Sequence, residues 1–360
     1  MTNPIQQLHD LGQSLWLDNM TREMLQDGTL RNYIKELSIT GLTSNPSIFD
    51  LAIKSGAYDD SIHAQTPAGL SSEDLFFQLA GEDLSRAADL FLPIYRATNH
   101  LDGWVSLEVS PLLAHDTKRT CEQVKSLHRQ IERPNLFIKI PGTPEGLPAI
   151  EEATFKGIPI NVTLLFSREQ YVAAAAAYQR GIERRIQVGL DPDVVSVASV
   201  FISRWDKAVS DKVPAELKNR LGIAIAGRTH KAYRELLDSH HSEVLASAGA
   251  RHQRLLWAST GTKDPQASDV LYVEALAAPD TINTMPDATL LAFADHGELR
   301  GVMPEDGGDA EAVLAEFERV GVDVADLADR LQREGADAFV KSWNDLLERI
   351  AAKSEALATS

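Results

Sequence analysis

Residues 136–166, LFIKIPGTPEGLPAIEEATFKGIPINVTLLF, decide the fold, because they read as a strand, a helix and a second strand. The two ends are short apolar runs rich in β-branched and aromatic residues, and Pro141-Gly142 stops the first of them. The segment between them, EGLPAIEEATFK, has a helical pattern. Short strands that alternate with helices predict βαβ units and therefore a parallel sheet.

The same alternation continues along the chain. The predicted strands are 14–19, 38–45, 104–110, 135–143, 158–166, 194–204, 254–260 and 281–286. Helical patterns follow five of them, at 21–37, 116–131, 145–156, 167–185 and 216–241. Eight such units match the count of a (β/α)8 TIM barrel, which is the fold class that we expect.

Two regions of the chain are additional to the eight strand–helix units of a minimal barrel. Residues 46–103 hold two or three helices between the second and third strands, and about 305–358 form a strongly helical tail. We find no internal repeat, no low-complexity linker and no clear boundary between domains. We therefore predict one domain, residues 1–360, with a helical insertion at about 46–103 and a C-terminal extension that packs on the outside of the barrel.

Composition narrows the class of protein. The chain has 360 residues and a net charge of −17, which argues against a general nucleic-acid or anionic-membrane surface. Its single cysteine, Cys121, excludes an intrachain disulfide and reads as a half-buried thiol in an amphipathic helix. The N-terminal residues have no secretory pattern, and the longest apolar run is too short to span a bilayer. We expect a cytoplasmic protein that binds neither membrane nor nucleic acid.

Polar side chains stand at the end of every predicted strand, where a barrel carries its catalytic groups. They are Asp18, Ser44-Asn45, Glu108, Lys139, Asn161-Thr163, Ser199-Ser203-Arg204, Ser259-Thr260 and Asn283-Thr284. Because ordinary turns are polar too, this pattern alone is weak evidence for a site.

Lys139 is more informative, because it interrupts an apolar strand. Burial disfavours the charged form of lysine, and a neutral amine is what a Schiff-base nucleophile requires. The alternative is a lysine that leaves the strand toward solvent or pairs with a carboxylate. Asp18 and Glu108, at two other strand ends, would supply the acid/base groups that Schiff-base chemistry needs.

Other motifs give weaker evidence about function. GLTSNPS (41–47) fits a turn, although Thr43 and Asn45 would place polar groups at the mouth of the barrel. His240-His241 lacks a third metal ligand nearby and reads as surface. The basic residues at 180, 184 and 185 read as a solvated helix face. No nucleotide-binding fingerprint appears, so a nucleotide cofactor has no support in the sequence.

Eight motifs, taken together and in this order, resemble the transaldolase family in its longer bacterial form, over about residues 12–300. They are WLDN, GLTSNPSIF, VSLEVSP, LFIKIPGTPEG, INVTLLFS, VASVFISRWD, LLWASTGTKDP and TINTMP. The stretches IKIPGTPEG and INVTLLFS are the most specific of them.

The resemblance implies roles for residues of this chain. Lys139 matches the lysine that forms a Schiff base with C2 of a ketose phosphate, and Asp18 matches the acid/base that takes the proton of the C4 hydroxyl. Glu108 and Thr163 match the pair that positions a catalytic water. The remaining matches are Thr43, Asn45, Asn161 and Ser199 for the three-carbon unit, Phe201 for an aromatic wall, and Arg204 and Ser259 for phosphate.

One position departs from the family pattern. Shorter members carry an arginine two residues after the serine of the seventh strand, where this chain has Gly261. Lys263, two residues further on, would supply that second cation.

The resemblance implies transfer of a dihydroxyacetone unit between sedoheptulose 7-phosphate or fructose 6-phosphate and an aldose phosphate, within the pentose phosphate pathway. It implies neither a metal nor an organic cofactor. One alternative is an aldolase that releases free dihydroxyacetone from fructose 6-phosphate. Glu108 counts against it, because the small aldolases carry an uncharged amide at that place. The other alternative is a barrel that binds sugar phosphates without catalysis. We expect the protein to be a monomer or a homodimer.

Overall fold

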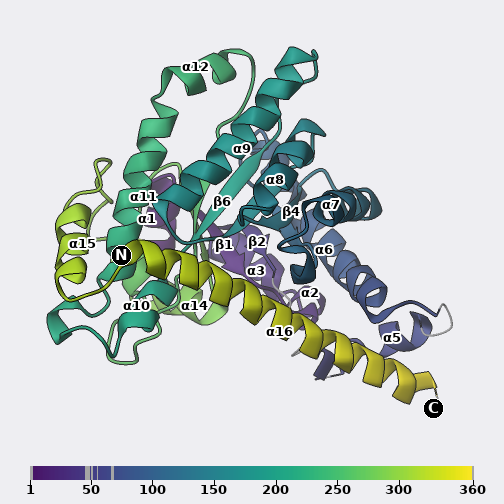
Figure 1. The fold of residues 1–360 in the computed structure, drawn as a ribbon. Helices are drawn as coiled ribbons and strands as arrows, with labels where there is room; N and C mark the ends of the chain where they lie inside the picture. Colours follow the sequence, from purple (N-terminus) through teal and green to yellow (C-terminus); the bar gives the residue numbers. More distant parts are fainter. Residues whose placement is uncertain (1–2, 45–48, 50–51, 55, 66–68, 359–360) are drawn as a thin grey trace.

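Eight parallel strands close into a barrel in the computed structural model, in the order β1 to β8 (Figure 1). The structure describes residues 3–44, 49, 52–54, 56–65 and 69–358. The strands are β1 Ser14–Asp18, β2 Ile39–Thr43, β3 Val105–Glu108, β4 Leu136–Pro141, β5 Ile160–Leu165, β6 Ser196–Phe201, β7 Arg254–Ala258 and β8 Ile282–Met285. Each lies inside one of the eight predicted runs, so the predicted (β/α)8 barrel is confirmed.

Strand β4 shows why the sequence folds this way. Leu136, Ile138 and Ile140 belong to one apolar cluster, whereas Phe137 belongs to another that also holds Trp16 of β1 and Trp104. Its ring stacks on Trp104 at 4.1 Å between centroids. Successive side chains of a strand point to opposite faces, so Lys139 shares the interior face with Phe137.

The register brings the ends of neighbouring strands to one level. Glu108 of β3 pairs with Lys139 of β4, and Lys139 pairs with Asn161 of β5. Residues that pair across parallel strands point to the same face, so these three side chains point into the barrel together.

The helices that surround the barrel differ in detail from the predicted ones. They are α1 Pro4–Asp10, α2 Arg22–Gln26, α3 Thr29–Glu36, α5 Asp59–Gln65, α6 Ser72–Ala97, α7 Thr117–Ile131, α8 Gly146–Phe155, α9 Arg168–Gln187, α10 Ser203–Val209, α11 Leu221–Leu237, α12 His240–Ser247, α13 Leu271–Ala275, α14 Asp287–His296, α15 Ala310–Arg319 and α16 Val324–Ala358. Short 3-10 turns, η2 and η3, span Pro111–Leu113 and Ala215–Leu217.

Two predicted helices are broken. The single helix expected over 21–37 is split into α2 and α3 by Gly28, whose φ of 85° is left-handed. The stretch 216–241 holds η3, α11 and the start of α12, since Asp238 and Ser239 end one helix and cap the next. The short helix α10 directly after β6 was not predicted.

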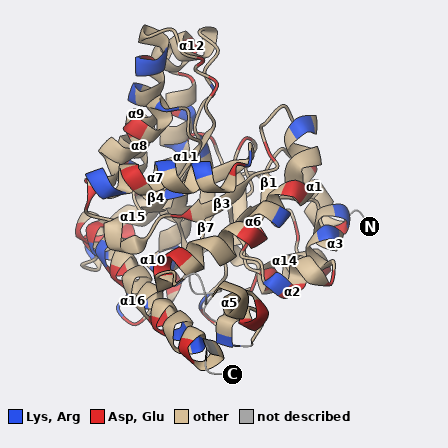
Figure 2. Cartoon of the chain, turned by 90° about the vertical axis from the view of Figure 1, so that its right-hand side faces the viewer, with Lys and Arg blue, Asp and Glu red and all other residues tan. Residues whose placement is uncertain are grey.

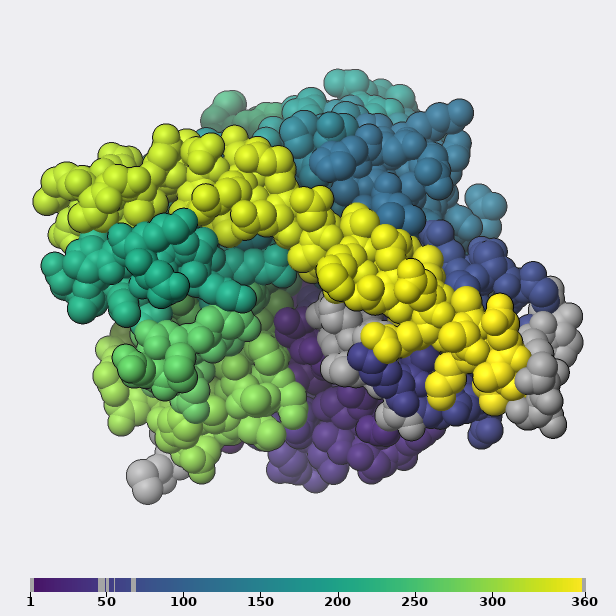
Figure 3. All heavy atoms as spheres, turned by 60° about the horizontal axis from the view of Figure 1, so that its bottom comes forward, coloured from purple at the N-terminus to yellow at the C-terminus, as the bar shows by residue number. Residues whose placement is uncertain are grey.

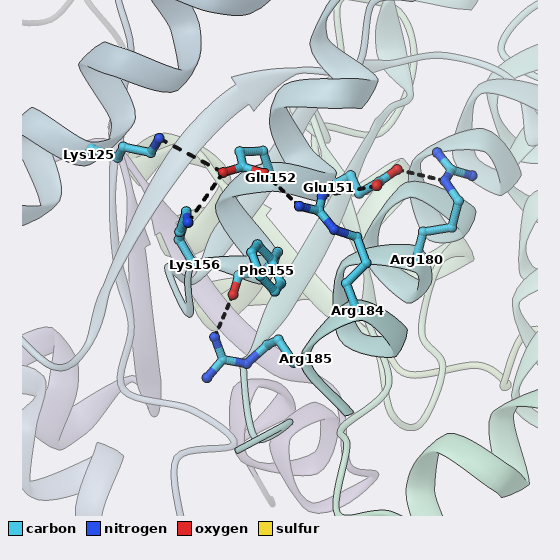
Figure 4. A network of polar contacts seen from close by, with 8 residues as sticks. All are labelled: Lys125, Glu151, Glu152, Phe155, Lys156, Arg180, Arg184 and Arg185. Atoms are coloured by element: carbon cyan, nitrogen blue, oxygen red, sulfur yellow. Dashed lines mark hydrogen bonds and ion pairs between the residues drawn. The ribbon is translucent and has the colours of Figure 1, made fainter. Parts of the chain in front are cut away.

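The arginines after the alanine-rich run do more than face solvent. Arg180 and Arg184 of α9 pair with Glu151 and Glu152 of α8, and Arg185 donates to a backbone carbonyl (Figure 4). The first two side chains are half exposed, so the face is solvated as predicted, but it also joins α8 to α9. Figure 2 shows acidic and basic residues interspersed on the outer helices in general.

The C-terminal helix α16 packs across one end of the barrel, a place that the sequence did not specify. Its 35 residues, about 50 Å of helix, cross the barrel end and contact α5, α6 and η2 (Figures 1 and 3). The Gln332 amide donates to the carbonyls of Gly142 and Leu164, at the ends of β4 and β5. The tail therefore lies over the carboxyl ends of the strands.

The prediction for the single cysteine is confirmed. Cys121 is a free, half-buried thiol on α7, and burial raises its pKa, which disfavours a role as nucleophile. Within the described residues, no helix is both long and apolar enough to cross a bilayer.

Candidate active site

A cavity of about 590 Å³ opens at the carboxyl ends of the strands. Most of the predicted site residues line it: Asp18, Thr43, Lys139, Thr163, Ser199, Phe201, Arg204, Ser259 and Lys263. Glu108 and Asn161 do not line it but are buried beside Lys139. Asn45 lies outside the described residues. The barrel thus brings together side chains from seven strand ends and the loops that follow them.

Lys139 is nearly inaccessible, at 6% exposure, and reaches the cavity from the end of β4. Its ammonium nitrogen is 3.2 Å from a carboxylate oxygen of Glu108 and donates to the carbonyl of Ser44 at 3.2 Å. The structure therefore excludes the alternative in which Lys139 leaves the strand toward solvent. It shows both a carboxylate partner and a lysine that faces the cavity.

Glu108 is the acid of this pair. Its side chain is 4% exposed, and burial raises the pKa of its carboxyl, while the charges of Lys139 and Arg204 partly offset that increase. A buried carboxyl with a raised pKa accepts a proton more readily than an exposed one, and here an amine lies beside it. The pair can therefore exchange a proton.

A chain of hydroxyl and amide groups surrounds the lysine. Ser199 donates to the Asn161 amide oxygen at 2.7 Å, and the Asn161 nitrogen donates to Ser106 at 3.2 Å. Across the barrel, the Thr43 hydroxyl donates to a carboxylate oxygen of Asp18 at 3.2 Å. The buried Thr163 hydroxyl has no hydrogen-bond partner within the described part of the chain.

Arg204 marks the far end of the cavity. It stands in the first turn of α10, and its guanidinium carbon lies 5.0 Å from the ring of Phe201 and 5.7 Å from that of Phe339 on α16. Burial lowers the pKa of Arg204, and the charges of Glu108 and Asp18 partly offset this. Among the described residues, no carboxylate lies within ion-pair distance of Arg204. Its planar fork of donors is thus open to an anionic ligand.

Two lysines and a strained serine stand at the same end. Lys207, one turn after Arg204 on α10, lines the cavity together with Lys263 and Ser259. Ser259 follows β7 in a left-handed conformation, with φ 56°, and shares a 3.0 Å hydrogen bond with the hydroxyl of Ser203. Such strain in a non-glycine residue is typical of functional sites.

Sequence reasoning missed three features of this cavity. Lys207 could have been found from its spacing of three residues from Arg204, which puts the two side chains on one helix face. Phe339 and Gly335, by contrast, come from α16, and no local pattern links that helix to the barrel mouth. Within the described residues, no group of His, Cys, Asp and Glu is arranged to hold a metal ion.

The fold and the cavity define a (β/α)8 barrel with a buried lysine and cationic groups at the carboxyl ends of its strands, where enzymes of this fold act. The chain belongs to the transaldolase/fructose-6-phosphate aldolase family, whose model matches residues 15–350. The family expected from the sequence motifs is confirmed.

Similar proteins span the whole chain. One named Transaldolase from Thermobifida fusca (strain YX) is 45% identical over 362 residues, covering 98% of each chain. Another, from Arthrobacter sp. (strain FB24), is 44% identical over 357 residues, covering 96% of each. Transaldolase 2 from Nostoc sp. (strain PCC 7120 / SAG 25.82 / UTEX 2576) is 39% identical over 375 residues, covering 99% of this chain and 98% of its own.

Proposed function

We propose that this protein is a transaldolase, which moves a dihydroxyacetone unit from a ketose phosphate to an aldose phosphate through a Schiff base on Lys139. The observation that carries the proposal is the buried pair of Lys139 and Glu108, because Lys139 lines a cavity that Asp18 and Arg204 also line. Family membership and the relatives named Transaldolase support it.

Lys139 would act as the nucleophile. Its amine attacks the C2 carbonyl of the donor, and the carbinolamine loses water to give a protonated imine. The imine is an electron sink for the carbanion that forms when the neighbouring C–C bond breaks. Transfer of the ammonium proton to Glu108, 3.2 Å away, would leave the neutral amine that attacks.

Asp18 would take the proton from the C4 hydroxyl as the C3–C4 bond breaks. Its carboxylate lines the cavity at the end of β1 and accepts a hydrogen bond from Thr43, which orients it. Bond cleavage releases an aldose phosphate and leaves a three-carbon enamine on Lys139. Addition of the enamine to a second aldehyde returns the proton from Asp18 to the new hydroxyl.

Glu108 and Thr163 would hold the water that leaves and returns during imine formation and hydrolysis. The Thr163 hydroxyl lines the cavity with its hydrogen-bonding capacity unused by the described residues, which suits this role. Thr43, Asn161 and Ser199 would bind the hydroxyls of the three-carbon unit, together with Asn45.

The phosphate of the sugar would lie at the opposite end of the cavity. Arg204 offers a bidentate fork, Ser259 a hydroxyl, and Lys263 the second cation expected from the sequence. Lys207 adds a further ammonium group from α10, so two lysines compete for the role of second cation.

A second candidate is an aldolase that releases dihydroxyacetone, since the family includes both activities by its description. The two differ in the fate of the enamine: in a transaldolase its carbon attacks an aldehyde, whereas in an aldolase it takes up a proton and water then hydrolyses the imine to release dihydroxyacetone. Glu108, buried and paired with Lys139, favours transfer, because the resemblance associates an uncharged amide with aldolases. The cytoplasmic location and a monomeric or dimeric state stay predictions.

The deciding experiment incubates the protein with fructose 6-phosphate, with and without erythrose 4-phosphate. We expect glyceraldehyde 3-phosphate and sedoheptulose 7-phosphate in equal amounts, and only when the acceptor is present. Sustained glyceraldehyde 3-phosphate release without acceptor would identify an aldolase. No product in either mixture would favour a barrel that only binds sugar phosphates.

A further inference from the structure

The C-terminal helix α16 forms one wall of the cavity, at the end where Arg204 stands. Leu331, Glu334, Gly335, Ala338 and Phe339 line the cavity from this helix. They recur at intervals of three or four residues, which places them on one face of the helix. The wall is therefore a continuous helix face rather than a chance contact of one side chain.

Two aromatic rings from different parts of the chain lie near the Arg204 guanidinium. Phe201 ends β6 and Phe339 lies on α16, 138 positions later in the sequence. The guanidinium carbon is 5.0 Å and 5.7 Å from the two ring centroids. Both distances fall within the range of an attractive cation–π contact.

The helix comes close enough to make this contact because Gly335 carries no side chain. A Cβ at that position would lie 3.2 Å from a terminal nitrogen of Arg204 and 2.9 Å from a methyl carbon of Leu164. Gln332, one turn earlier, holds the helix at this depth through its two bonds to the strand ends. The approach of α16 is thus set by two residues beside Phe339.

We propose that Phe339 is a positioning residue for phosphate recognition: its ring, carried over the barrel mouth by α16, holds the Arg204 guanidinium in the orientation that binds a phosphoryl group. The proposal rests on the proposed function in taking a sugar phosphate as the ligand. A long arginine side chain without a carboxylate partner loses rotamer freedom when it binds an anion, and a ring that fixes it beforehand reduces that cost.

The test titrates the whole protein with inorganic phosphate by calorimetry, which requires no turnover. Phe339→Leu should weaken phosphate binding about three- to thirtyfold, since it keeps an apolar side chain but removes the ring. Phe339→Tyr should restore most of the affinity. Gly335→Ala should weaken it as well, because the added Cβ displaces the guanidinium.

The matched control is Phe317→Leu. Phe317 lies on α15 in the same apolar cluster that Phe339 packs against, but it does not line the cavity. It should lower stability and leave phosphate affinity unchanged. Equal weakening by Phe339→Leu and Phe317→Leu, or wild-type affinity in Phe339→Leu, would overturn the proposal.

Two further measurements separate positioning from general damage. With fructose 6-phosphate as donor, Phe339→Leu should raise KM and leave kcat nearly unchanged, the signature of lost uniform binding. In an Arg204→Ala background the same change should have no further effect on kcat/KM, and an undiminished effect there would refute action through Arg204. If the protein shows no transfer activity but its phosphate affinity depends on Phe339, the proposed function fails and this inference stands.

Discussion

Replacing Lys139 with methionine should abolish turnover and also make the stability of the folded protein depend on pH. Methionine has nearly the length of lysine but no charge, so the variant keeps the volume and loses the nucleophile. Glu108, 4% exposed, is left in the barrel interior without the ammonium group 3.2 Å away. Removing one partner of a buried ion pair costs about 3 to 5 kcal/mol.

The sign of the pH dependence follows from the pKa of Glu108. Burial already raises this pKa above the ordinary value of 4.5, and Lys139 is the largest influence that opposes the increase. Without Lys139 the folded protein therefore binds a proton that the unfolded chain has lost. Stability is unaffected below about pH 4.5 and falls by about 1.4 kcal/mol per pH unit above it.

The assay combines chemistry with unfolding. Borohydride reduction in the presence of fructose 6-phosphate should attach a three-carbon or six-carbon adduct to the wild-type chain and none to Lys139→Met. Urea unfolding between pH 5 and 8 should show the falling stability. The double variant Lys139→Met/Glu108→Gln is the matched control, because it removes the whole charge pair and should lose the slope while staying inactive.

Two results would refute the reasoning. Normal turnover or a borohydride adduct in Lys139→Met would exclude this residue as the nucleophile. A pH-independent stability in the single variant would show that Glu108 is not the buried partner on which the proton-exchange step depends.

Further predictions concern the phosphate end and the outer helices. The KM for fructose 6-phosphate should identify the second phosphate-binding cation when Lys263→Ala and Lys207→Ala are compared. The variant that lacks this cation should raise KM about tenfold. If neither variant raises KM, Arg204 is the one cation that binds the phosphate. Ser259→Gly should relieve the left-handed strain and raise the free energy of unfolding by about 1 kcal/mol. It should also raise KM, because the hydroxyl that would bind phosphate is lost. A lower free energy of unfolding would show that no strain is stored at this residue. Glu151→Ala should lower the free energy of unfolding by only about 0.5 kcal/mol, because its two arginine partners on α9 are half exposed (Figure 4). It should leave turnover unchanged. A stability loss that persists in high salt would contradict a screened surface pair.

The barrel was predictable because each strand carries a local signal. A run such as 136–141 is apolar on both faces, and its length and its stop at Pro141-Gly142 distinguish it from a helix. Helix boundaries were less predictable, as the break at Gly28 shows, because one left-handed residue ends a pattern that otherwise continues. Lys139 was detectable for the same local reason: it is a charge within a buried strand.

The sequence by itself determined the eight strands and the polar residues at their ends, because these signals depend on neighbours within a few positions. The alternation of strands with helices also indicated that the strands are parallel. Only the tertiary structure decided that Glu108 is the partner of Lys139 and that α16 crosses the barrel mouth. Both depend on groups far apart along the chain, and the amphipathic pattern of a helix shows that one face is buried without showing against what. Phe339 therefore reads as an ordinary apolar residue in sequence and becomes a neighbour of Arg204 only when the chain is folded.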